Sequence, residues 1–247
     1  MKFLVSLSIL VSLFLFGLDC WALPPVAQSG AKVRAIQLKQ SHYFFGNLDI
    51  IASKSSIRME DTGSWKFVLV ANAPDWKVTV FRNDDKLYYT CPLKTFLEGG
   101  LVSQLLVGKK SASFGPGQEE PTTAIIGGVK VKKVVARYAL CEYLPTDTLV
   151  APEITQIIYE TLRMPMNGGI CLRFVQDKGG TDWMTGLKES GEHIMLSTQS
   201  AKMVTVPSTT FDAPVGYKKS KSLREVLISN ESRESSTDAR DLFEIKR

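Results

Sequence analysis

Few residues in this chain have both the type and the spacing that enzyme chemistry requires. The sequence has two histidines, His42 and His193, and neither stands beside a second base or metal ligand in a known motif. We expect both histidines at the surface or at the edge of a strand. The glycine doublets are scattered among turn-like stretches and form no phosphate-binding loop, and no nucleophile–base pair is visible. The residues therefore predict that the protein is not an enzyme and has no catalytic residue, no metal site and no cofactor.

The cysteines are the second group of residues with chemical potential. Removing a predicted leader that contains Cys20 leaves Cys91, Cys141 and Cys171, with no CxxC pair and no zinc-like spacing. One disulfide plus one thiol is the simplest outcome, and the spacing alone leaves the pairing open. Cys141 and Cys171 lie in predicted strands on either side of a predicted helix, so a helical crossover could return them to neighbouring positions. We favour this pair for a disulfide.

The first residues predict export. A positive start at Lys2 precedes an apolar run over residues 3–18, and "CWA" at residues 20–22 has the small residues of a cleavage site. We interpret residues 1–22 as a signal peptide, which places the mature protein in the periplasm or outside the cell. An uncleaved anchor and a lipid-modified Cys20 are the alternatives.

Composition indicates an ordinary globular protein, and its length is enough for one large β-rich domain or two small ones. Hydrophobic residues make up 44% and charged residues 22% of the 247 residues, and the net charge is +5. The lysines are spread out and no basic stripe is interleaved with aromatics, so we expect no nucleic-acid partner. The mature chain is predicted to be a single domain over residues 23–229, followed by a disordered charged tail over residues 230–247.

Alternating apolar residues predict a β-rich fold. Residues 32–91 read as consecutive strands with short connections, which is typical of an antiparallel meander, and strands return over 122–144, 168–178 and 192–207. A helical stretch interrupted by glycines covers 92–107, and an exposed loop is expected over 108–121.

The other predicted helices are short. Residues 152–163 place Ile154, Ile157 and Ile158 on one stripe, and Ser222 opens a last helix with capping-box spacing. We expect about nine to eleven strands and two or three short helices, hence a mainly β fold with a curved sheet. The sequence leaves open whether helices and side chains fill its concave face or leave a hollow there.

Three stretches resemble the superfamily of outer-membrane lipoprotein carriers, the LolA-like proteins. They are "FGNLDIIASKSSIRMED", "WKFVLVANAPDWKVTVFRNDDKLYYT" and "KMVTVPSTTFDAPVGYKKSKSLREVL". The resemblance implies an unclosed antiparallel half-barrel with helices over a concave face that holds acyl chains. It also places Arg58 where the carrier has an arginine that helps to hold a helical lid closed. Met59 replaces the carrier's following proline, and the segment 108–121 is an addition, so the resemblance indicates a distant relative with another cargo.

The predicted function is the binding of a hydrophobic ligand, either a lipid or the acyl chain of a lipoprotein. Burying a chain of about a dozen carbons contributes on the order of 10 kcal/mol, so such a site needs no polar motif. The alternative is an envelope protein-interaction or sensor module without a small ligand. The predicted ligand-binding residues are Trp65, Phe67, Leu69, Trp76, Val78 and Val80 on the sheet and Ile154, Ile157 and Ile158 on the helix.

Overall fold

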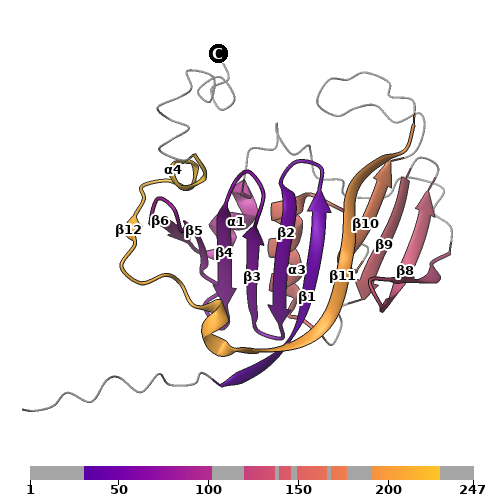
Figure 1. Ribbon diagram of the computed structural model, residues 1–247, viewed down its shortest axis with the longest axis horizontal. Coiled ribbons are helices and arrows are strands. Elements are labelled where there is room, and N and C mark those ends of the chain that lie inside the picture. The colour runs from indigo at the N-terminus through magenta and orange to yellow at the C-terminus, as the bar shows by residue number, and fades with distance from the viewer. Residues whose placement is uncertain are drawn as a thin grey trace, which may run out of the picture.

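Twelve strands form one sheet that stays open at its two edges (Figure 1). The computed structural model describes residues 31–101, 120–136, 139–145, 149–165, 168–176 and 191–228. The strand order is β12-β6-β5-β4-β3-β2-β1-β11-β10-β9-β8-β7, and every pairing except β12 with β6 is antiparallel. The predicted fold class is confirmed, with one strand more than the upper expectation.

The first six strands form the predicted meander, in which each strand pairs with the one that follows it along the chain. Their short connections leave no room for crossovers, so neighbours in sequence become neighbours in the sheet. The strands are β1 (Lys32–His42), β2 (Gly46–Ser53), β3 (Ser56–Asp61), β4 (Phe67–Asn72), β5 (Val78–Arg82) and β6 (Leu87–Cys91).

The later strands extend the sheet from the other side of β1. The strand β11 returns from the distal part of the chain and pairs along the whole length of β1, which joins the two halves of the sheet. The strands are β7 (Thr122–Ile126), β8 (Val129–Ala136), β9 (Ala139–Pro145), β10 (Gly169–Gln176), β11 (His193–Pro207) and the short β12 (Lys218–Lys219).

Irregular pairing bends the sheet near this junction. The register shifts between β1 and β11 at Gln40 and between β9 and β10 around Leu172. Such bulges increase local twist and free backbone groups from the ladder. The Gln40 amide donates to the carbonyl of Cys171 at 3.0 Å, and the Thr198 hydroxyl donates to that of Leu172 at 2.7 Å, so side chains satisfy the freed carbonyls.

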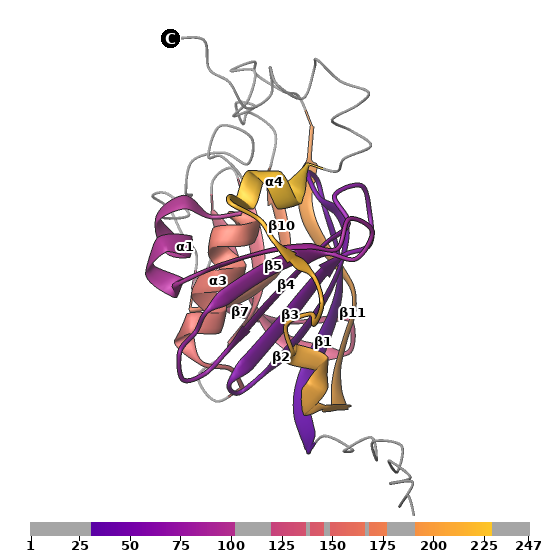
Figure 2. The same ribbon diagram turned by 90° about the vertical axis from the view of Figure 1, so that its left-hand side faces the viewer.

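Three short α-helices and one 3-10 turn accompany the sheet in the described residues. They are α1 (Leu93–Gly99), α3 (Pro152–Leu162), α4 (Leu223–Leu227) and η1 (Ser208–Phe211). Figure 2 shows α1 and α3 side by side on one face of the sheet. Pro152 begins α3 at a position where no backbone donor is needed, and Glu153 lies favourably in its first turn. The predicted helix over 92–107 is described only to Leu101.

The main core lies between the sheet and α3. It contains the inward-facing residues of β1 to β5, among them Leu38, Ile50 and Met59, together with the apolar stripe of α3. The opposite face of the meander carries a small second cluster of Val68, Val70 and Phe81. Successive residues of β4 therefore point into apolar clusters on both faces of the sheet, as expected for a central strand.

Three sequence predictions lie outside the described residues. They are the signal peptide over 1–22, nearly all of the loop over 108–121, and the tail over 230–247. Among the helices that are described, none has the length and apolar character needed to cross a bilayer.

Candidate functional site

The predicted ligand-binding residues all belong to one place in the molecule, the main apolar core, which lies between the sheet and the helices α1 and α3 on one of its faces (Figure 2). Seven of them are buried members of the main core, and Trp65 and Trp76 pack against that core with part of their surface exposed. The seven buried residues are Phe67, Leu69, Val78, Val80, Ile154, Ile157 and Ile158, and each is at most 2% exposed.

These exposures describe a closed arrangement, in which side chains fill the space that the sequence left undecided. A ligand between the sheet and α3 would have to replace contacts that these residues now make with one another. Trp65 precedes β4 and Trp76 follows it, so the two partly exposed indoles mark opposite ends of the interface.

Hydrogen bonds fasten both ends of α3 to the meander. At its start, the backbone N–H of Ala151 donates to the carbonyl of Lys54, in the β2–β3 turn, at 3.2 Å. At its end, Nε2 of His42 lies 3.0 Å from the carbonyl oxygen of Leu162. The apolar stripe of α3 lies between these two attachments.

His42 is buried, and the expectation that it lies at the surface or a strand edge is wrong. Its side chain is on the core-facing side of β1, and the residue is 2% exposed. The backbone N–H groups of Phe44 and Phe45 both donate to Nδ1 at 3.2 Å, so Nε2 carries the proton and donates to Leu162. Burial lowers the pKa of His42 to about 4, against a smaller opposing effect of the Leu162 carbonyl. The phase of the alternation Ile36, Leu38, His42 was the signal that could have placed it inside.

Arg163, which forms a buried ion pair at the end of α3, joins this helix to α1. Nη1 of Arg163 lies 2.6 Å from Oε2 of Glu160, with the two side chains 0% and 5% exposed, and Nη2 of Arg163 reaches the carbonyl of Gly99 at 3.5 Å. Gly100 has a φ of 68°, and a Cβ there would lie 2.9 Å from the Glu160 carbonyl oxygen. Because α1 and α3 are so closely joined, we treat them as one helical layer.

Arg58 does not contact this helical layer, so the predicted lid contact is wrong. Its neighbours Ile57 and Met59 point into the core, and alternation turns Arg58 to the opposite face of β3. There Nη2 donates to Glu60 at 2.7 Å, and the guanidinium lies 5.9 Å from the ring centroid of Phe81.

Cys141 and Cys171 lie together on the neighbouring strands β9 and β10. Their sulfur atoms are 3.6 Å apart, and both residues are free thiols. Cys91 is also a free thiol. The proximity of the favoured pair is thus present, while the disulfide between them stays a prediction. Burial raises the pKa of the Cys171 thiol well above its usual value, and the neighbouring Cys141 adds to this effect.

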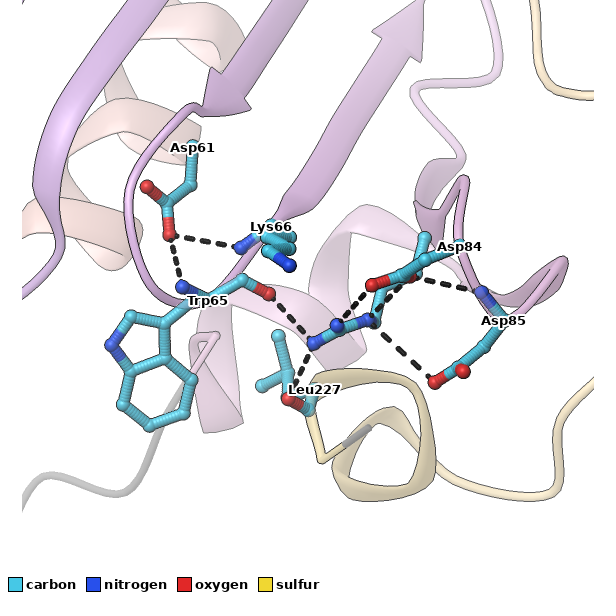
Figure 3. Close-up of polar contacts among 7 residues, drawn as sticks. Asp61, Trp65, Lys66, Asp84, Asp85 and Leu227 are labelled. Carbon is cyan, nitrogen blue, oxygen red and sulfur yellow. Dashed lines mark hydrogen bonds and ion pairs between the residues drawn. The ribbon is translucent and has the colours of Figure 1, made fainter. Parts of the chain in front are cut away.

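A second group of polar residues lies around the β3–β4 turn and the end of β5, next to α4, and no sequence pattern predicted it. The carboxylate of Asp61 accepts from the backbone N–H groups of Gly63, Trp65 and Lys66 and so holds the β3–β4 turn. Figure 3 shows the bonds to Trp65 and Lys66. Asp61 is 3% exposed, and desolvation raises its pKa despite these hydrogen bonds.

Arg82 connects this turn to the C-terminal helix. Its Nη1 donates to the carbonyl of Trp65 at 2.8 Å and to that of Leu227 at 3.3 Å, and Nη2 pairs with Asp84 at 2.5 Å. The hydrogen bond from Arg82 lowers the pKa of Asp84. The two backbone carbonyls that Arg82 binds belong to residues 17 and 145 positions away in the sequence. The alternation of residues along β5 therefore could not predict that Arg82 joins the β3–β4 turn to α4.

A shallow pocket of about 200 Å³ lies beside this network on the face opposite α3. It is lined by Glu60, Asp61, Lys66, Val68, Asn83 and Asp84. Its carboxylates are engaged by Arg58, Arg82 and backbone donors. Within the described ranges no three His, Cys, Asp or Glu side chains are grouped so as to hold a metal ion.

Comparison with known proteins identifies no family for this chain. No protein-family model matches it, and no curated protein sequence is significantly similar. Among solved structures, it is similar to an uncharacterized conserved protein from Thermus thermophilus, with 12% identity, a TM-score of 0.38, and 78% of this chain and 91% of that chain covered. It is also similar to PNGF-II, with 15% identity, a TM-score of 0.35, and 77% of this chain but 31% of that chain covered. Neither likeness is strong enough to support an argument about function.

Proposed function

We propose that the mature protein binds a long apolar ligand, a lipid or the acyl chain of a protein, between the sheet and α3. The observation that supports this proposal is the main apolar core, which is enclosed by an open sheet on one side and a short helical layer on the other. The helical layer is joined to the meander by few polar bonds, two of which are at the ends of α3.

The free energy gained by burying an acyl chain is large enough to compensate for the contacts that α3 would lose. Separating the four buried aliphatic side chains of α3 from the core, those of Ile154, Ile157, Ile158 and Leu162, costs about 2 kcal/mol each, or about 8 kcal/mol in total. An acyl chain of about a dozen carbons contributes on the order of 10 kcal/mol when it is buried. The ligand therefore offsets the cost of displacing α3 without any polar recognition site.

The proposal places the protein in the cell envelope of its source or outside the cell. A carrier of this kind would receive its cargo from a membrane or from an acylated protein, and these are the partners we propose. The chemistry involves no bond making or breaking, so the protein is proposed to be a binding protein rather than an enzyme.

A protein-interaction or sensor module is the second candidate. The observation that favours it is the complete burial of Ile154, Ile157 and Phe67 without a ligand, since a core that is already filled needs no cargo for stability. In that case the sheet would be a scaffold, and the chain would bind no lipid.

Replacing Ile157 by Asp tests the first proposal directly. Ile157 is fully buried, and an unpaired carboxylate there costs several kcal/mol if α3 has to stay in place. If α3 can leave the sheet, the variant stays folded and loses affinity for a fluorescent fatty acid. Titration and thermal melting are measured on the same samples.

Gln156→Asp is the matched control because it adds the same charge to the exposed side of α3. It should bind and melt like the wild type. A wild type without saturable fatty-acid binding would overturn the proposal, and an unfolded Ile157→Asp variant beside a normal control would favour a permanently filled core.

A further inference from the structure

The two ends of α3 are attached to the sheet by different kinds of hydrogen bond, and this difference bears on which end can open. At the start of α3 the bond joins two backbone groups, Ala151 and Lys54. At its end the bond is made by one side chain, His42, to the last residue of the helix, Leu162. A rotation of the His42 side chain is sufficient to break the bond at the second end, whereas the bond at the first end breaks only if the backbone moves. Arg163 joins the second end of α3 to α1, so the two helices stay together when the His42 bond is broken.

His42 is held in position by the turn that follows it. Because Phe44 and Phe45 donate to Nδ1, the ring presents its only N–H to Leu162. The ring also lies against Phe45, with a centroid distance of 5.1 Å. The β1–β2 turn therefore aims a single donor at the end of α3.

A continuous series of aromatic rings begins at the same turn and leads into the core. Phe44 lies 5.2 Å from Trp65 and 5.1 Å from Phe45, and Phe45 lies 5.5 Å from Phe67, measured between ring centroids. Exposure falls along this series from 39% at Tyr43 to 1% at Phe45 and 0% at Phe67. Apolar surface thus runs without interruption from solvent to the predicted ligand-binding residues.

The opposite end of the interface is attached through backbone groups alone. There the N–H of Ala151 donates to the carbonyl of Lys54, and Trp76 packs against the main core with part of its surface exposed. Asn72 and η1 belong to the other face of the sheet, because Asn72 continues the phase of the β4 residues in the small second cluster and donates through Nδ2 to the carbonyl of Phe211 at 2.9 Å. The difference between the two ends therefore lies in how α3 is attached to the sheet.

We propose that the apolar ligand enters at the His42 end of α3, across Tyr43, Phe44 and Trp65, and that His42 holds this entrance closed. The inference rests on the proposed function and adds the place of entry, the direction in which α3 opens and the residue that controls it. His42 acts here as a positioning residue through α3 and makes no contact with ligand in the closed state.

The order in which ligand reaches the two ends can be measured with the chain's own tryptophans. Two variants retain only Trp65 or only Trp76, with the other tryptophans replaced by Phe. A brominated fatty acid quenches indole fluorescence at short range, so stopped-flow mixing reports arrival at each end separately. We expect quenching of Trp65 to precede quenching of Trp76.

Substitution at His42 tests its part in the entrance. His42→Phe keeps an aromatic ring but removes the donor to Leu162, so association of the fatty acid should become about three- to tenfold faster, the effect of losing one hydrogen bond. His42→Gln retains a donor and should restore a rate near that of the wild type. Phe44→Ser, which interrupts the aromatic series, should slow association in an otherwise folded protein.

The outcomes separate the entrance from the proposed function. Saturable binding in which Trp76 is quenched first, or an association rate unchanged in His42→Phe, overturns the entrance and leaves the binding function intact. No saturable binding in the wild type overturns the binding function itself. If His42→Phe does not fold, the order of quenching in the two single-tryptophan variants decides the question.

Discussion

His42 is neutral in the folded chain because its ring is surrounded by apolar groups and both of its nitrogens are engaged. Adding a proton to Nδ1 would remove the acceptor of two backbone N–H groups and place a charge in the core. The attachment of the end of α3 to β1 therefore depends on the protonation state of one imidazole, because His42 donates to the carbonyl of Leu162.

This state makes stability depend on pH. The pKa of His42 is 6.5 in a free chain and about 4 in the folded chain, so between these values the unfolded chain binds more protons. The contribution of His42 to the free energy of unfolding is full above pH 6.5 and is lost as the pH falls toward 4, by about 3 kcal/mol. Urea unfolding of the wild type and of His42→Gln between pH 4 and 8 measures it. We expect the difference between the two proteins to shrink at low pH, and a constant difference would contradict the prediction.

The sulfur atoms of Cys141 and Cys171 are 3.6 Å apart, so we expect these two residues to form a disulfide under oxidising conditions. Refolding in oxidised glutathione should convert the two thiols to one disulfide and release two molecules of glutathione thiol. The folded protein should resist the same reagent, because burial and a raised pKa leave Cys171 little thiolate. Peptide mapping after alkylation checks the pairing. Cys91→Ser should leave the bridge intact and Cys141→Ser should abolish it, and a bridge that contains Cys91 would disprove it.

At the scale of elements, α4 is attached to the sheet by packing and by Arg82. Val226 and Leu227 belong to the main core, and Ser222 caps the helix by accepting from the backbone N–H of Glu225 at 3.2 Å. Arg82 adds a donor to the carbonyl of Leu227 near the end of α4. A helix of this length is not stable in isolation, so tertiary contacts decide whether it forms.

Arg82→Met should therefore loosen α4. The substitution leaves the carbonyls of Trp65 and Leu227 without this donor, and we expect a loss of about 2–4 kcal/mol in the free energy of unfolding. Limited proteolysis should cut near α4 at lower protease concentrations than in the wild type. Arg58→Met is the control, because its pair with Glu60 is partly exposed on the opposite face and should contribute less than about 1 kcal/mol. Equal effects of the two substitutions would refute this role of Arg82.

At the scale of the whole molecule, the far end of the sheet curls back toward its middle. The β7–β8 turn reaches β11, where the backbone N–H of Ala201 donates to the carbonyl of Gly127 at 3.3 Å. Gly127 and Gly128 have φ values of 56° and 89°, as a two-residue hairpin turn requires. The sheet stays open at its edges, yet its last strands enclose part of the core.

The two glycines of this turn provide a matched pair for testing the curl. A Cβ on Gly127 would lie 2.7 Å from the backbone nitrogen of Ala201, whereas a Cβ on Gly128 meets nothing within 4 Å. Both alanine substitutions strain a positive φ, at about 1 kcal/mol. Gly127→Ala should cost a further 1–3 kcal/mol or so by displacing the turn from β11. Chemical denaturation of both variants measures the difference, and similar losses would show that the contact contributes nothing.

Local patterns were sufficient for much of the fold. The alternation of apolar residues predicted consecutive strands over residues 32–91, and Phe67, Val68 and Leu69 lie in one of them with both of its faces buried. The stripe of α3 and the capping spacing of Ser222 and Glu225 also predicted what is observed. These features depend on side chains close together in sequence, whose periodicity is set by the geometry of one strand or one helical turn.

The candidate site was predictable only in part. The sequence identified the apolar residues that meet between the meander and α3, because each lies on the apolar side of its own element. It did not reveal His42 as the partner of Leu162, Arg82 as the partner of Leu227, or the true side of Arg58. Each of the first two pairs joins elements more than a hundred residues apart, and no local pattern encodes such a distance.

The sequence by itself determined that this is a mainly β chain with a meander and an amphipathic α3, since periodicity and composition are local properties. Only the tertiary structure decided that β11 pairs with β1, that side chains fill the space under α3, and that one end of α3 is held by a side chain. The physical reason is that long-range pairing, close packing and the burial of a neutral histidine are cooperative. Each depends on all the elements being in place at once.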